Sequence, residues 1–241
     1  MPEPVRDPER LHVALMLTVT FSTGIVDAVG YLGLDRVFTA NMTGNVVILA
    51  MGLTGSNGLP VVGPVVALTG FVIGAVIAGR ALRGVPKGWS RRDTTLLTAV
   101  AALLVVAVVP TVVVPAAPYP PAVGLPVTAL LGLAMGMQAG TARHIAVADV
   151  TTVVVTSTLA GLGFDSRLGR HVHQPWVRRL LAVVLIAAGA LVGAALLLVR
   201  FWLGLGLAAL ILVVVAALGH LGQRPSPVSA EREGARATAG Q

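Results

Sequence analysis

Residues 11–32 read LHVALMLTVTFSTGIVDAVGYL, an apolar stretch with a single carboxylate, Asp27, inside it. About 20 apolar residues in a helix cross the roughly 30 Å hydrocarbon core of a bilayer. A carboxylate at that depth costs roughly 2.5–3.5 kcal/mol on insertion scales, so such a group faces a bundle interior or an aqueous cavity. The stretch therefore predicts a membrane-spanning helix with a functional polar group on its protein-facing side. It is too long for the apolar region of a signal peptide and lacks an A-x-A cleavage site, so we expect it to be retained.

The rest of the chain repeats this composition. Hydrophobic residues make up 56% of the 241 residues and charged residues only 11%, too few to cover the surface of a soluble protein. We expect an all-α integral membrane fold, in one polytopic domain over residues 11–221, with an N-terminal tail over 1–10 and a disordered tail over 222–241. Six stretches are long enough to span, namely 11–32, 59–82, 94–114, 123–141, 180–199 and 201–221, and two shorter ones, 38–53 and 150–162, are expected to be re-entrant or half-helical.

Several classes of protein are excluded or disfavoured. There is no cysteine, which excludes disulfides, thiolate nucleophiles and Cys-ligated metals. No G-x-S-x-G, H-E-x-x-H or Walker sequence is present, so we expect neither an enzyme nor a bound cofactor. His171 and His173 lie in a basic loop without a carboxylate or Cys partner, and we expect no metal site there. The basic residues lie between apolar segments, where membrane topology accounts for them without a nucleic-acid partner.

The distribution of Lys and Arg predicts the topology. If all eight segments crossed the membrane, the 17 basic residues would divide almost evenly between the two sides. If both short segments enter and leave on the same side, 15 lie on the side of the termini and only 2, Arg36 and Arg200, on the other. The positive-inside rule then places both termini in the cytoplasm of a bacterium, with the protein in the inner membrane. A seven-span alternative, with only the second short segment re-entrant, has a split of 14 to 3 and stays open.

An internal repeat favours six spans. Thr43 follows Gly24 by 19 positions and Thr156 follows Gly136 by 20, and each stretch runs from a span into a short segment. With three crossings per unit, the second copy is inverted relative to the first, as in many transporters. We predict an inverted 3+3 repeat, with units at about 11–114 and 123–221. Six glycines are expected at close helix contacts, Gly24, Gly70, Gly74, Gly136, Gly189 and Gly193.

The motifs Gly24-Ile-Val-Asp27-Ala28 and Asn41-Met-Thr-Gly-Asn45, followed by Gly136-Met-Gln138 and Arg143, resemble the YoaK-like family of bacterial multi-spanning membrane proteins of unknown function. The resemblance extends over about residues 11–221 and implies a bacterial integral membrane protein, without a substrate or a reaction. The chain departs from the family pattern at Ala139, where the family tends to have Asn. A polar partner for Asp27 at that position is therefore not expected.

The candidate site consists of the polar residues within the apolar segments. Asp27 is interpreted as a proton- or cation-binding carboxylate, or alternatively as a structural one paired with Arg143 or with threonines. The Asn and Thr residues either cap short helices or face a solute in a cavity. Arg143 and Asp149 are expected to gate the cytoplasmic mouth or to mark the membrane interface. The proposed solute or ion site comprises Asp27, Asn41, Thr43, Asn45, Gln138, Thr152 and Thr156.

These residues predict a transporter or channel for a small polar solute or ion, in contact with the lipid bilayer. The alternative is a membrane scaffold or sensor that transports nothing. The sequence leaves the charge of the solute open, because one Asp and two Asn suit a cation whereas two helix N-termini suit an anion. It also leaves the oligomeric state open.

Overall fold

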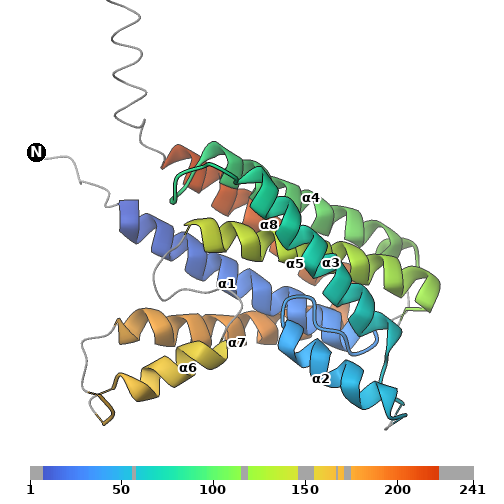
Figure 1. The fold of residues 1–241 in the computed structure, drawn as a ribbon. Coiled ribbons are helices and arrows are strands. Elements are labelled where there is room, and N and C mark those ends of the chain that lie inside the picture. The colour runs from blue at the N-terminus through green and yellow to red at the C-terminus, as the bar shows by residue number, and fades with distance from the viewer. Residues whose placement is uncertain are drawn as a thin grey trace, which may run out of the picture.

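The computed structural model describes residues 8–55, 58–114, 119–145, 155–166, 168–170 and 175–222. Over these residues the fold is entirely helical (Figure 1). The remaining residues, which include most of both predicted tails and the His171/His173 loop, lie outside the described part. The helices are α1 (Pro8–Gly33), α2 (Met42–Leu53), α3 (Val62–Ala81), α4 (Arg91–Val113), α5 (Pro121–Ile145), α6 (Val155–Phe164), α7 (Trp176–Val199) and α8 (Phe201–Leu221).

Six of the helices, α1, α3, α4, α5, α7 and α8, are long and apolar enough to cross a membrane, and α2 and α6 are shorter. This confirms the predicted fold class of six spanning helices and two short ones. At 12 and 10 residues, α2 and α6 reach about 18 and 15 Å, roughly half of the hydrocarbon thickness. Most boundaries differ from the predicted segments by a few residues, and α2 begins at Met42 and not at Phe38. Residues 150–154, the predicted start of the second short segment, lie outside the described residues.

Each short helix starts within the bundle and ends at one face of it. The start of α2 lies beside Asp27, which precedes the end of α1 at Gly33 by six residues, or about 9 Å along the helix axis. The end of α2 contacts the segment that leads into α3, because a Cβ on Gly52 would lie 2.9 Å from the Pro60 carbonyl oxygen. At the other face, Asp165, directly after α6, pairs with Arg179 near the start of α7 at 2.9 Å. In Figure 1 the two short helices point their first turns toward the middle and end at opposite ends of the molecule.

Glycines bring two pairs of spanning helices into backbone contact. Helix α1 packs on α7, and α3 packs on α5 in the same manner. In both pairs, residues later in one helix contact residues later in the other, so the two paired helices run parallel. A Cβ on any of four central glycines would collide with a carbonyl of the facing helix, since Gly24 meets Ile186, Gly189 meets Phe21, Gly136 meets Phe71 and Gly74 meets Leu133.

The first predicted unit comprises α1 to α4 and the second comprises α5 to α8. The same helix contacts are obtained when each helix is replaced by its counterpart in the other unit, α1 by α5, α2 by α6, α3 by α7 and α4 by α8. The α1/α7 contact corresponds to α5/α3, α4/α5 to α8/α1, and α2/α3 to α6/α7. The exchange pairs Gly74, which meets Leu133, with Gly189, which meets Phe21. The contact pattern accords with an inverted repeat, which itself stays a prediction.

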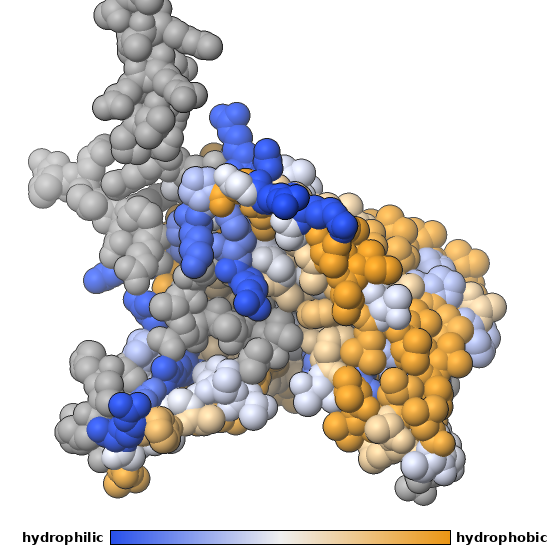
Figure 2. All heavy atoms as spheres, in the orientation of Figure 1, coloured by the Kyte–Doolittle hydropathy of each residue, from blue (hydrophilic) through white to orange (hydrophobic). Residues whose placement is uncertain are grey.

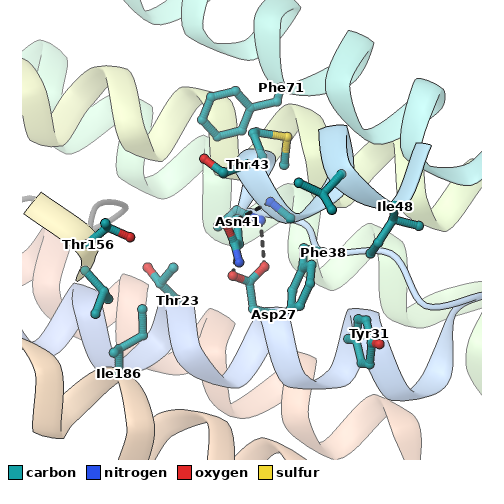
Figure 3. A pocket seen from close by; sticks show the side chains of 15 residues that line it. Thr23, Asp27, Tyr31, Phe38, Asn41, Thr43, Ile48, Phe71, Thr156 and Ile186 are labelled. Carbon is teal, nitrogen blue, oxygen red and sulfur yellow. Dashed lines mark hydrogen bonds between the residues drawn. The ribbon is translucent and has the colours of Figure 1, made fainter. Parts of the chain in front are cut away.

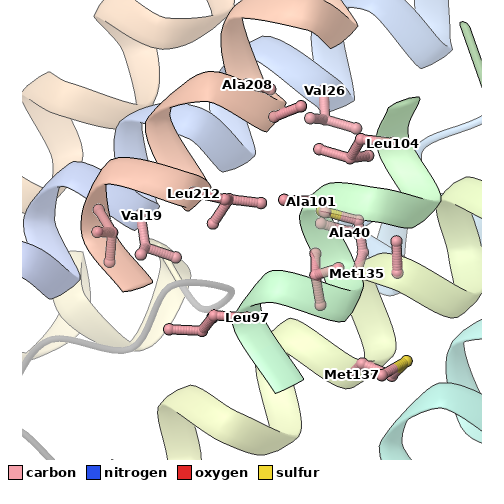
Figure 4. Packing of buried hydrophobic residues seen from close by; sticks show 14 of the residues in the cluster. Val19, Val26, Ala40, Leu97, Ala101, Leu104, Met135, Met137, Ala208 and Leu212 are labelled. Carbon is pink, nitrogen blue, oxygen red and sulfur yellow. The ribbon is translucent and has the colours of Figure 1, made fainter. Parts of the chain in front are cut away.

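The core lies between α1, α4, α5 and α8 and is filled by aliphatic side chains and methionine (Figure 4). Val19, Leu104, Leu131 and Leu212 have no exposed surface. The outer surface is apolar as well, with Val65, Val72, Ile73, Val76 and Ile77 of α3 exposed. Figure 2 shows this apolar face at the right, and hydrophilic side chains gathered above it and at the left.

Both ends of the described chain lie at one end of the bundle. A Cβ on Gly222, after α8, would lie 2.5 Å from the side chain of Leu11 near the start of α1. Trp89, which precedes α4, stacks on His12 of α1 with ring centroids 5.7 Å apart and reaches Gly219 of α8. The segment between α3 and α4 therefore shares a side with the two ends, as an even number of crossings requires.

Candidate functional site

The carboxylate of Asp27 binds the chain that leads into α2. Its Oδ1 accepts hydrogen bonds from the backbone N–H of Thr39 (2.8 Å), from the Thr39 hydroxyl (3.1 Å) and from the N–H of Ala40 (2.6 Å). Its Oδ2 accepts one from the N–H of Asn41 at 3.1 Å. The structure thus places Asp27 on the protein-facing side of α1, against the start of the first short helix (Figure 3).

The predicted Asn residues hold this lead-in in place. The amide group of Asn45 spans the backbone of Phe38, with Oδ1 accepting from its N–H at 2.9 Å and Nδ2 donating to its carbonyl at 2.6 Å. Asn41 is the N-cap of α2 and accepts from the N–H of Gly44 at 3.2 Å. Asn45 is fully buried whereas Asn41 is exposed, so Asn45 has a structural role and Asn41 remains accessible to a ligand.

A cavity of about 760 Å³ lies where the two short helices begin. It is bounded by α1, by the start of α2, by Phe71 of α3, by the first turn of α6 and by Ile186 of α7. Figure 3 shows Thr43 and Asn41 on one side of this space, Asp27 and Thr23 below it, and Thr156 at its far end. The lining residues are Thr23, Asp27, Tyr31, Phe38, Ala40, Asn41, Met42, Thr43, Gly44, Val47, Ile48, Phe71, Val155, Thr156 and Ile186.

Four of the predicted site residues therefore line one cavity, Asp27, Asn41, Thr43 and Thr156. Gln138 lies next to it, because its Nε2 donates at 2.8 Å to the hydroxyl of Thr23, which lines the cavity. The Oε1 of Gln138 is buried and accepts no hydrogen bond from the described residues. Thr152 lies outside the described residues.

The predicted gate is only partly described. Arg143 is exposed in the last turn of α5, at the opposite end of that helix from the α4–α5 connection, and Asp149 lies outside the described residues. The partners found for Asp27 are Thr39, Ala40 and Asn41 and not Arg143, so the ion-pair version of the structural alternative finds no support among the described contacts.

Asp93, which the sequence interpretation did not single out, contacts His144 at that end. Asp93 is fully buried and lies 2.9 Å from Nδ1 of His144, whose Nε2 is 3.2 Å from the carbonyl oxygen of Val85. Asp93 also belongs to the capping box that begins α4 at Ser90. The S-x-x-D spacing was the available signal for this N-terminus. Thr23 and Thr39, which contact Gln138 and Asp27, carried no distinguishing pattern.

The described residues contain no group of three or more His, Cys, Asp or Glu side chains arranged to hold a metal ion. In the cavity itself, Asp27 is the one carboxylate among the described lining residues, and they include no Lys, Arg or His. Tyr31, Phe38 and Phe71 contribute aromatic rings, and the first two are stacked with centroids 4.6 Å apart.

Six membrane-length helices, an apolar outer face and two half-length helices that begin at one cavity define a polytopic integral membrane protein. Comparison with known sequences shows the family to which it belongs. Residues 15–218 match the family described as "Protein of unknown function (DUF1275)", and the chain belongs to this family. It is 31% identical over 197 residues to the UPF0700 transmembrane protein YoaK of Bacillus subtilis (strain 168), covering 74% of this chain and 80% of that relative. The resemblance seen in the Gly24 and Asn41 motifs is thereby confirmed. No solved structure matches the chain.

Proposed function

We propose that the protein is a transporter or channel for a small polar solute or ion. The observation that carries the proposal is the cavity, which the starts of α2 and α6 line together with Asp27. Half-length helices are stable at membrane depth only where their free backbone groups face protein or a water-filled cavity. Its volume of about 760 Å³ suits a small molecule, since ligand pockets measure roughly 300–1,000 Å³.

The arrangement of the helices supports movement around this cavity. In the proposed inverted repeat, the third helix of each unit packs on the first helix of the other, as α3 does on α5 and α7 does on α1. Each glycine contact thus joins two helices into one rigid pair, and the cavity lies between the pairs, with Phe71 on one and Asp27 and Ile186 on the other. Rocking of the α3/α5 pair against the α1/α7 pair would open the cavity to one side at a time.

We further propose that both termini face the cytoplasm of a bacterial inner membrane. The support is the 15-to-2 division of Lys and Arg, together with the shared position of the chain ends and the 84–90 segment. Reporter tags at residue 5, within 84–90, within 115–120 and at the C-terminus test it, and only the 115–120 tag is expected outside. A periplasmic 84–90 tag would refute the orientation, and a periplasmic residue 5 alone would favour seven spans.

Transport can be tested before the substrate is known. Proteoliposomes mixed rapidly with concentrated salts or neutral polar solutes swell only if the solute enters, and light scattering follows the swelling. We expect entry of at least one solute, and its loss in Thr43→Trp, which fills the cavity. Val72→Trp is the matched control, because Val72 follows Phe71 on α3 but is 59% exposed on the outer face.

A scaffold or sensor without transport is the second candidate. The observation that favours it is the set of four hydrogen bonds by which Asp27 fixes the start of α2, a use of the carboxylate that requires no solute. In that case no solute of the panel would cause swelling, and Thr43→Trp proteoliposomes would behave as the wild type does.

A further inference from the structure

We propose that the cavity binds an organic monocation, with an ammonium group beside Asp27 and an apolar body against the aromatic rings. This inference rests on the proposed function and assigns the chemical class of the solute. It follows from three features of the cavity, namely which donors are already engaged, what charge the lining carries, and what surrounds that charge.

The backbone donors of residues 38–41, which lead into α2, are already engaged. A helix N-terminus attracts anions through its free N–H groups and its partial positive charge. Here the N–H groups of Thr39, Ala40 and Asn41 are bound to Asp27, and the N–H of Gly44 is bound to the side chain of Asn41. The carboxylate therefore takes the place that an anionic solute would occupy, and an anion entering the cavity would meet Asp27 itself.

The charge of the lining favours a cation. Asp27 faces no Lys, Arg or His among the described residues that line the cavity, so its negative charge is balanced only by hydrogen bonds. Its two oxygens are unequally used, because Oδ1 accepts three hydrogen bonds and Oδ2 accepts one. A carboxylate oxygen offers about two lone-pair directions, so Oδ2 retains acceptor capacity toward an ammonium group.

The surroundings favour an organic cation over a metal ion. A bare metal ion requires several oxygen ligands at close range, whereas aromatic ring faces attract ammonium groups at about 6 Å or less from the ring centre. The cavity combines one carboxylate with Tyr31, Phe38 and Phe71, and Ile48 and Ile186 add aliphatic surface. Its volume of about 760 Å³ also exceeds what a single ion fills. Figure 3 shows Phe71 across the cavity from Asp27, where a bound cation would lie between ring and carboxylate.

The test compares two probes of the same shape and different charge. Choline and its neutral carbon isostere, 3,3-dimethylbutan-1-ol, are titrated calorimetrically into the purified full chain in detergent micelles. We expect saturable binding of choline, none of the isostere, and none of acetate. Equal binding of the two isosteres, binding of acetate alone, or no choline binding at any soluble concentration would overturn the proposal.

Two variants locate the binding. Phe71→Leu removes a ring face and is expected to weaken choline binding about 2- to 30-fold, the range of one cation–π contact. Phe21→Leu is the matched control, since Phe21 is a partly buried residue of α1 that packs on the core and does not line the cavity. Asp27→Asn should abolish binding; should that variant not fold, the Phe71 result alone decides. Unchanged affinity in Phe71→Leu would overturn the assignment to this cavity.

The outcome is separable from that of the proposed function. Swelling with other solutes but no choline binding would leave transport standing and refute the organic cation. Choline binding that depends on Phe71, without any flux in proteoliposomes, would support the ligand class and refute transport, which would favour a sensor.

Discussion

Replacement of Asp27 separates its structural contribution from its contribution to solute handling. In Asp27→Ala, four donors lose their acceptor, and two of them are N–H groups of buried residues, Thr39 and Ala40. A buried donor left without a partner costs about 1–3 kcal/mol, so the pair predicts a loss of roughly 2–6 kcal/mol in the free energy of unfolding. The other two donors can find new acceptors in the cavity. Water can reach the N–H of the exposed Asn41, and the hydroxyl of Thr39 can rotate toward another acceptor.

Asp27→Asn is expected to behave differently. An Asn side chain keeps an oxygen for the three donors at Oδ1 and places an NH₂ group against the N–H of Asn41, so one hydrogen bond of four is lost. We expect a loss of about 1–2 kcal/mol, a folded protein, and no binding or coupling that needs the charge.

The assay is equilibrium unfolding by sodium dodecyl sulfate in mixed micelles, combined with hydrogen–deuterium exchange of the amides of residues 39–41. Exchange should accelerate strongly in Asp27→Ala and weakly in Asp27→Asn. Asp35→Ala is the control, because Asp35 is exposed in the same loop and surface changes usually stay within about 0.5 kcal/mol. If Asp27→Ala matches Asp35→Ala in stability and its amides remain protected, the carboxylate does not hold α2 and the reasoning is wrong.

Two further predictions concern helix packing and the buried contact between Asp93 and His144. Gly136→Ala should lower the free energy of unfolding by about 1–3 kcal/mol, because its Cβ would collide with the Phe71 carbonyl, whereas Gly79→Ala, with nothing within 4 Å, should be neutral or slightly stabilising. Equal effects in the same unfolding assay would contradict the close helix contact. Asp93→Asn should lower the free energy of unfolding by about 1–3 kcal/mol because it disrupts a buried hydrogen bond to His144, and the loss should shrink when His144→Gln is already present. Additive losses in that double-mutant cycle would show that the two side chains are not coupled.

The fold was largely predictable because hydropathy depends only on the length and composition of each segment. Phe201–Leu221 was predicted to the residue, and the other spans within a few residues. The predicted short segment began at Phe38, four residues before α2, although Asn41 was correctly expected as a helix cap. The amides of residues 39–41 bind Asp27 instead, a contact between residues 12 to 14 positions apart that no local pattern reveals.

The candidate site was predictable only in part. Intramembrane Asp, Asn and Thr residues are conspicuous in an apolar sequence, and four of those selected line one cavity. Their roles were not evident, since Asn45 closes a loop with Phe38 while Asn41 stays accessible. Asp93 was missed because a charge at the end of a span is normally solvated, and its burial depends on His144, 51 residues away.

The pairing of α1 with α7 has a consequence for biosynthesis. Gly24 contacts its partner helix only after the ribosome has added the 162 residues up to Ile186. At about 5–20 residues per second, α1 waits roughly 8–32 s in the membrane without its principal neighbour. The hydrogen bonds of Asp27, its one carboxylate, can form much earlier, because the donors Thr39, Ala40 and Asn41 are synthesised directly after it. The segment between α1 and α2 can therefore satisfy the Asp27 carboxylate on its own, long before the rest of the bundle is synthesised.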